Sequence, residues 1–138
     1  MAFTHGKDSV FSLDDTGGSL QDITAFVNGV DGLPGDIDMA ETTTLGNEAK
    51  TYIPGLDDAQ VTVSGVWDST LDGYVGTLAQ RKAATRTFEW GPEGSTASNV
   101  KFSGEGYIQS YSASSPVGDI VTWSMTIQVT GGVTVGTY

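Results

Sequence analysis

The chain has 138 residues, no cysteine and a formal net charge of −11, with six basic residues against 17 acidic ones. This length predicts a single domain, residues 1–138, with a core of its own. The lack of cysteine excludes a disulfide framework and a thiolate metal site. The scarcity of bases argues against ordinary nucleic-acid binding, which needs them to neutralise phosphates. No stretch has the apolar length of a signal peptide core or a membrane span, so we expect a soluble protein made in a cytoplasm.

The charge is distributed unevenly along the chain. Residues 1–79 hold 13 acids and two bases, whereas residues 80–138 hold four acids and four bases. Solubility alone is one explanation of this asymmetry. The other explanation is a surface that must stay repulsive towards a polyanion.

The first elements in chain order are β-strands. Thr and Val together supply 31 residues, which favours a mainly β domain. Lys7–Leu13 is predicted to be a strand, residues 14–18 (DDTGG) a tight polar turn, and Leu20–Val27 a returning strand. The N-terminus should therefore form a hairpin.

Residues 28–58 differ from the rest of the chain. They contain two Pro-Gly pairs and several acids but few large apolar side chains, and most loops in compact domains are only about 4–6 residues long. We predict a projecting β-arm or long loop that is mobile unless a partner orders it. Its candidate contact residues are Asp36, Ile37, Asp38, Met39, Glu41, Thr42, Thr43, Thr44, Leu45, Asn47, Glu48 and Lys50.

In residues 60–85 the spacing of the apolar residues changes from the alternation of a β-strand to the spacing of an α-helix, and this happens nowhere else in the chain. Large apolar residues alternate through QVTVSGVW, as in a half-buried strand, and Gly65 on the same face indicates close backbone approach, a bulge or a bend. The spacing of Leu71, Val75 and Leu78 then predicts one amphipathic helix over residues 69–83, with Ser69 as its N-cap. The core scaffold is predicted to contain Trp67, Leu71, Val75, Leu78, Phe88 and Trp123.

Three further strands follow the helix. They are predicted over residues 85–90, 100–111 and 120–129, and the tail GGVTVGTY should add an edge strand or remain loose. The fold class is therefore mainly β: a β-sandwich or barrel-like subunit of about seven strands, with one flanking α-helix and the long arm.

No catalytic or metal-binding constellation is present in the sequence. His5 is the only histidine and lies near the N-terminus, and the acidic pairs do not match a calcium-binding loop. No phosphate-binding loop or nucleophile elbow occurs. We therefore expect neither an enzyme nor a protein with a metal or cofactor.

Three segments together are similar to one known family. The stretch GLDDAQVTVSGVWDSTLDGYVGTLAQRKAATRTFEWGPEG resembles the strand–helix–strand element of the tail tube (major tail) proteins of long-tailed bacteriophages. ETTTLGNEAKTYIPGL resembles the long arm of that family, and GYIQSYSASSPVGDIVTWSMTIQVTGGVT resembles its final pair of strands. The likeness covers roughly residues 20–133, and it depends on the order and spacing of these segments.

The resemblance implies a structural virion protein with itself as its main partner. Such subunits form hexameric rings that stack into a hollow tail tube, with inner strands closing a barrel around the lumen. The arm would reach an adjacent subunit or ring. The tape measure, terminator and tip proteins would be further partners. The protein would be assembled in the bacterial cytoplasm, and DNA would pass through the lumen without specific binding.

The lining of the lumen is predicted from polar positions on two strands. The candidates are Asp22, Thr24, Thr122, Ser124, Thr126 and Gln128. A lumen of acids and uncharged polar groups would let DNA slide during ejection. The alternatives are a monomeric β-sandwich module that binds carbohydrate or calcium, or another ring-forming tail component such as a terminator.

Overall fold

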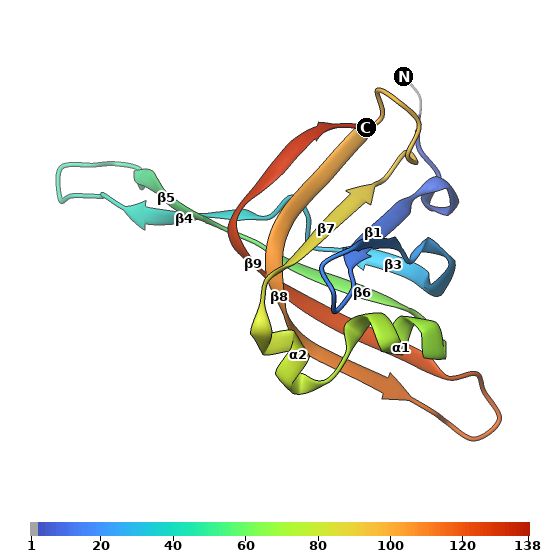
Figure 1. Cartoon of the computed structure of the whole chain (residues 1–138). Helices are drawn as coiled ribbons and strands as arrows, with labels where there is room; N and C mark the ends of the chain where they lie inside the picture. The colour runs from blue at the N-terminus through green and yellow to red at the C-terminus, as the bar shows by residue number, and fades with distance from the viewer. Residues whose placement is uncertain (1–2) are drawn as a thin grey trace.

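The computed structural model describes residues 3–138 and consists of a seven-stranded antiparallel sheet from which a two-stranded hairpin projects (Figure 1). The strand order in the large sheet is β2-β1-β7-β8-β9-β6-β3, and β4 pairs only with β5. The prediction of a mainly β chain is confirmed. The elements are η1 (Gly6–Asp8), β1 (Val10–Asp14), β2 (Leu20–Asp22), η2 (Thr24–Phe26), β3 (Val27–Asp31), β4 (Asp36–Glu41), β5 (Tyr52–Asp58), β6 (Gln60–Val66), α1 (Ser69–Val75), α2 (Leu78–Ala83), β7 (Arg86–Gly91), β8 (Val100–Ser114) and β9 (Thr122–Thr137).

The core lies on one face of the large sheet, which curls around it (Figure 1). Apolar residues at alternate positions of each strand point to this face, because side chains alternate between the two sides of a strand. On β9 the buried positions are Trp123, Met125, Ile127 and Val129. Of the predicted core scaffold, Leu71, Val75, Phe88 and Trp123 are fully buried, whereas Trp67 is half-buried and packs at the margin of the core.

Gly65 has the close backbone approach that the sequence predicted. A Cβ atom at this position would lie 1.8 Å from the carbonyl oxygen of Phe26. Gly65 pairs with Val27, and the register shifts between Val27 and Gly29. The absence of a side chain therefore allows the start of β3 to lie against β6.

The helical region consists of two short helices, not the single helix predicted over residues 69–83. The chain breaks at Gly76, whose φ of 79° is a left-handed conformation that suits glycine. Asp68, not Ser69, is the N-cap of α1, and its side chain accepts a hydrogen bond from Thr70 N. Thr77 and Gln80 form a capping box that starts α2 in a new direction. As a result Leu78 turns away from the core and is 67% exposed, so its assignment to the scaffold was wrong.

Arg86 is the one charged side chain buried among residues 3–138, with 3% exposure. Its guanidinium donates hydrogen bonds to the carbonyl oxygens of Tyr74, Val75 and Asp14. Burial lowers the pKa of this guanidinium, and the nearby carboxylates of Asp14 and Asp15 oppose that effect. The side chain joins α1 to the start of β7 and the end of β1.

Several strand boundaries differ from the predicted ones. The first strand begins at Val10 instead of Lys7, because Gly6–Asp8 form a 3₁₀ turn. The second strand ends at Asp22, because Thr24–Phe26 form a 3₁₀ turn before β3 begins. The predicted strand Leu20–Val27 is therefore divided between two elements. The C-terminal tail is part of β9 and pairs with the first residues of β8, so it is neither loose nor a separate edge strand.

Candidate assembly surfaces

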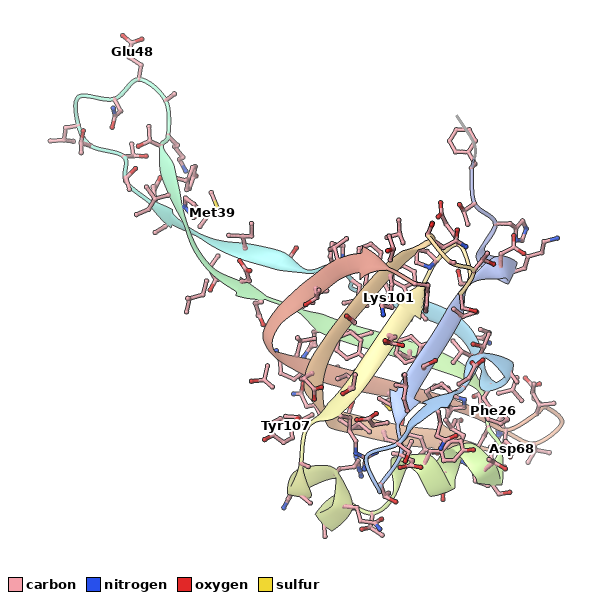
Figure 2. The ribbon with its side chains drawn as sticks, turned by 45° about the horizontal axis from the view of Figure 1, so that its top comes forward. Phe26, Met39, Glu48, Asp68, Lys101 and Tyr107 are labelled. Atoms are coloured by element: carbon pink, nitrogen blue, oxygen red, sulfur yellow. The ribbon has the colours of Figure 1, made fainter. Side chains whose placement is uncertain are left out.

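The predicted arm is present as the β4–β5 hairpin, which projects away from the large sheet (Figure 2). It spans residues 36–58, whereas residues 27–31 belong to β3 in the large sheet, so the arm is shorter than the predicted 28–58. Every residue of β4 and β5 is exposed. The hairpin therefore has no cover from its own subunit. Figure 2 shows Met39 on the projecting ribbon and Glu48 at its tip.

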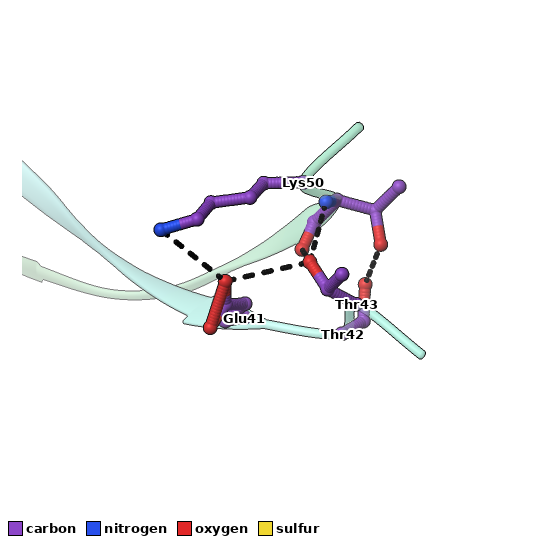
Figure 3. A network of polar contacts seen from close by, with 5 residues as sticks. Glu41, Thr42, Thr43 and Lys50 are labelled. Atoms are coloured by element: carbon purple, nitrogen blue, oxygen red, sulfur yellow. Dashed lines mark hydrogen bonds and ion pairs between the residues drawn. The ribbon is translucent and has the colours of Figure 1, made fainter. Parts of the chain in front are cut away.

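Side-chain hydrogen bonds order the tip of the hairpin. The hydroxyl oxygens of Thr42 and Thr51 lie 2.8 Å apart, and Thr51 N donates to Thr43 Oγ1 at 2.9 Å (Figure 3). The Lys50 ammonium lies 3.9 Å from the Glu41 carboxylate (Figure 3). Asn47 closes the turn by accepting a hydrogen bond from Thr44 N at 2.7 Å. These contacts give the arm a defined tip, although it buries no apolar side chain.

One face of the hairpin carries an apolar stripe that the sequence did not reveal. Residues paired directly across an antiparallel ribbon share a face, and the pairs are Ile37 with Asp57, Met39 with Pro54 and Glu41 with Tyr52. The face therefore has an apolar centre with an acid near each end. We call it the hairpin stripe; it consists of Ile37, Met39, Glu41, Tyr52, Pro54 and Asp57. Tyr52 and Pro54 lie within the predicted arm but were not among its candidate contact residues, because only the register places them beside Met39 and Glu41.

A second surface lies on the side of the sheet opposite the core and consists of uncharged polar side chains, with the carboxylates of Asp31 and Asp58 at its margin. Gln60 Nε2 donates to Gln109 Oε1 at 2.9 Å and to Gln128 Oε1 at 3.2 Å across three neighbouring strands. Alternation with the buried positions of β6 and β9 assigns the other members to this side. We call this surface the neutral face; it consists of Gln60, Thr62, Ser64, Gln109, Ser110, Ser112, Thr122, Ser124, Thr126 and Gln128.

The structure brings four of the six lumen candidates together and separates the other two. Thr122, Ser124, Thr126 and Gln128 form one row on the neutral face. Asp22 and Thr24 lie at the far end of the sheet, where the Thr24 hydroxyl donates to Asp22 and the Asp22 carboxylate also accepts from Thr24 N. In the sequence, Asp22 and Thr24 alternate with apolar residues as they would in a continuous strand. This pattern does not indicate that β2 ends at Asp22.

Most of the acids in the first half of the chain lie away from the neutral face, but Asp31 pairs with Thr62 at its margin and the Asp58 carboxylate accepts a hydrogen bond from Gln128 Nε2. Six of them are on the hairpin and its base: Asp36, Asp38, Glu41, Glu48, Asp57 and Asp58. Others belong to turns and helix caps, such as Asp15, whose pKa is lowered chiefly by the hydrogen bond from the backbone of Ser19. The negative charge is thus concentrated on the part of the subunit that projects furthest.

Among the unpaired strand edges of residues 3–138, two lie beside the strands that carry the neutral face. β3 ends the sheet and pairs only with β6. The second half of β8, residues 110–114, pairs with β9 on one side, because β7 pairs with β8 only as far as Gly106. These edges lie at the two sides of the four strands β8-β9-β6-β3, which carry the neutral face.

Among residues 3–138, no group of three or more His, Asp or Glu side chains could hold a metal ion. No helix in this range combines the length and apolar character that crossing a membrane requires.

Comparison with solved structures identifies the fold. The chain is similar to the tail of an empty gene transfer agent particle with C6 symmetry, with a TM-score of 0.74, 15% identity and coverage of 97% of this chain and 99% of that one. It is similar to a chain of the sheath–tube complex of an extracellular contractile injection system, PVC (TM-score 0.71, 14% identity, coverage 99% and 93%). It also resembles the SPP1 tail tube (TM-score 0.70, 15% identity, coverage 99% and 80%). No protein-family model and no curated protein matches the sequence.

These likenesses extend over nearly the whole chain and define a class by fold: an antiparallel curled sheet with a projecting hairpin, as in tail and tube subunits. The resemblance that the sequence suggested therefore agrees with the structural neighbours.

Proposed function

We propose that this chain is the tail tube subunit of a phage-like particle, which forms hexameric rings that stack into a hollow tube for DNA ejection. The observation that carries the proposal is the likeness to the gene transfer agent tail over 97% of this chain and 99% of that chain. A match of this extent includes residues of the hairpin as well as those of the core. The role is structural and needs no catalytic group.

The free strand edges support ring formation. An edge strand exposes unpaired backbone N–H and C=O groups, and pairing β3 of one copy with residues 110–114 of β8 of the next would satisfy both edges. Such a contact joins two different surfaces. A heterologous contact of this kind closes into a ring when the rotation between copies permits it.

The neutral face supports the role of a DNA conduit. In a closed ring of such sheets, Thr122, Ser124, Thr126 and Gln128 would line the bore on the side away from the core. Tight binding of DNA depends on bases that neutralise phosphates. A lining of hydroxyl and amide groups would offer no fixed positive charge, so DNA could slide without being held. The acids on the hairpin would add to a field that repels the polyanion.

The hairpin supports stacking of one ring on the next. It projects from the sheet with all of its strand residues exposed, as expected of an element whose cover comes from another copy. Tape measure, terminator and tip proteins would meet the tube at its interior and ends. The assembled protein would be located in the virion tail after assembly in the bacterial cytoplasm.

Negative-stain microscopy of the purified protein tests the proposal. We expect hollow tubes or six-fold rings at high protein concentration. Single rings that never stack would favour a tail terminator. Particles that remain monomeric, at the 14.4 kDa of one chain, would contradict the proposal.

A further inference from the structure

A groove of about 370 Å³ lies between α2 and the middle of β8. Ile108 is buried, while Leu78 and Tyr107 are exposed apolar side chains at 67% and 44%. Figure 2 places Tyr107 at the end of the sheet next to α2. We call this surface the α2 groove; it is lined by Leu78, Arg81, Lys82, Tyr107, Ile108 and Gln109.

The α2 groove carries two cations that have no ionic partner within residues 3–138. The ion pairs found there join Lys50 to Glu41 and Lys101 to Glu89. Arg81 and Lys82 are not in either pair, and the Nε atom of Arg81 is buried without a hydrogen-bond acceptor in that same range. A buried donor without an acceptor costs free energy. The groove therefore suits a partner that brings both apolar surface and carboxylates.

The hairpin stripe has the complementary chemistry. Its apolar centre, Ile37, Met39, Tyr52 and Pro54, would cover Leu78 and Tyr107, while Glu41 and Asp57 near its ends could meet Arg81 and Lys82. An isolated two-stranded hairpin is at best marginally stable in water, so covering the stripe would also stabilise the arm. At about 3.3 Å per residue, the six residues of β4 extend roughly 20 Å from the sheet, which is enough to reach a neighbouring subunit.

We infer that the hairpin stripe of one copy docks into the α2 groove of a second copy. This inference rests on the proposed function, because it names the surface that receives the arm in the assembled tube. The subunit's own groove is not the receptor, since the strands of the hairpin are exposed along their whole length. A cavity of about 450 Å³ near Lys7, Val10 and Trp90 is the competing receptor, but it offers one base where the α2 groove offers two.

Cross-linking between engineered cysteines tests the docking, because the natural chain has no cysteine. Combining Met39→Cys with Leu78→Cys should give covalent ladders of subunits on oxidation of assembled protein, and monomers when assembly is prevented by dilution. The matched control combines Met39→Cys with Lys7→Cys, which places the second thiol at the competing cavity.

The outcomes separate the docking from the proposed function. Tubes that form but give no ladder with Leu78→Cys, or give one only with Lys7→Cys, would overturn the docking and leave the tube function standing. Failure of the wild-type chain to form rings or tubes would overturn both.

Reversal of charge gives an independent test. Lys82→Glu should raise the protein concentration needed for stacking by roughly tenfold. This factor corresponds to the binding free energy that is lost with one or two ion pairs. Adding Asp57→Lys to the same chain should restore most of the loss. Lys7→Glu makes the same change of charge outside the groove and should have little effect on stacking. An effect of Lys7→Glu equal to that of Lys82→Glu would overturn the inference.

Discussion

Arg86 Nη2 donates a hydrogen bond to the carbonyl oxygen of Val75 at 3.0 Å, and this contact joins the first residue of β7 to the last residue of α1. Arg86 Nη1 donates to the Tyr74 carbonyl at 2.9 Å. The last carbonyl groups of a helix lack partners within it and carry partial negative charge, so a buried guanidinium satisfies both needs. Arg86 thus helps to fix the position of α1, which also buries Leu71 and Val75 in the core.

Replacement of Arg86 should therefore destabilise the subunit. Arg86→Met keeps apolar bulk but leaves three backbone carbonyls without their donor, and we expect the free energy of unfolding to fall by about 3 kcal/mol. Urea denaturation at concentrations below assembly measures the change. Lys82→Met removes an exposed cation near the same place and should change unfolding by less than about 0.5 kcal/mol. Equal effects of the two variants would contradict the role assigned to Arg86.

Two glycines should respond oppositely to the same substitution. Gly65→Ala would place a Cβ 1.8 Å from a backbone carbonyl, so β3 must separate from β6 and we expect a loss of several kcal/mol or failure to fold. Gly73 lies inside α1 with open space around it, so Gly73→Ala should raise stability by about 0.5–1 kcal/mol. Thermal unfolding followed by circular dichroism distinguishes them. Two similar shifts in midpoint would contradict this account.

The sequence predicted those features that follow from local periodicity. Alternation identified the mainly β fold, the face of β9 and the close approach at Gly65, and the paucity of apolar residues identified the arm. What it missed depends on contacts between distant segments. The break at Gly76 and the burial of Arg86 became apparent only once α1, β1 and β7 were adjacent.

Of the candidate assembly surfaces, the sequence likewise predicted only the parts that follow from local periodicity. A row of alternating polar residues predicted four of the ten residues of the neutral face, but the register of β4 against β5 was needed to find the hairpin stripe. Residues near Asp22 also alternate, yet backbone hydrogen bonds end that strand early. Periodicity shows which residues share a face of one strand and cannot show which strands lie side by side.

Tyr111 should ionise later than an ordinary tyrosine. Burial, together with the hydrogen bond to Asp72, raises the pKa of Tyr111 from 10.0 to about 12. The unfolded state therefore loses its proton first, so this group's contribution is complete below pH 10 and is lost as pH rises towards 12. Tyr111→Phe should flatten the decline in stability over that range. In an absorbance titration, one tyrosine of the Asp72→Asn variant should ionise at lower pH than in the wild type. An unchanged transition would contradict the role assigned to Asp72.

Removal of the hairpin should abolish stacking while preserving the fold. Asp36 and Asp58 are directly paired across the hairpin, so an Asn-Gly turn can replace Ile37–Asp57 without disturbing the large sheet. We expect single rings and a melting temperature close to that of the intact subunit. Glu48→Gln, which changes only the tip, should still form tubes. Tubes formed by the shortened chain would show that the hairpin has another role.

The neutral face should be inaccessible from outside an assembled tube. We expect Thr126→Cys to react with a small maleimide in tubes but not with a maleimide polymer wider than the bore. Dissociated subunits of the same variant serve as the control and should react with both reagents, because residue 126 lies on an unprotected side of the sheet. Equal reaction with the polymer in both states would place the neutral face on the outer wall.

The break at Gly76 places the two short helices under different structural constraints. α1 supplies Leu71 and Val75 to the core and is constrained by it, whereas α2 contributes no fully buried residue. Substitutions in α2 can therefore accumulate with little penalty in folding. The surface that α2 presents to a neighbour can therefore change while the core stays the same.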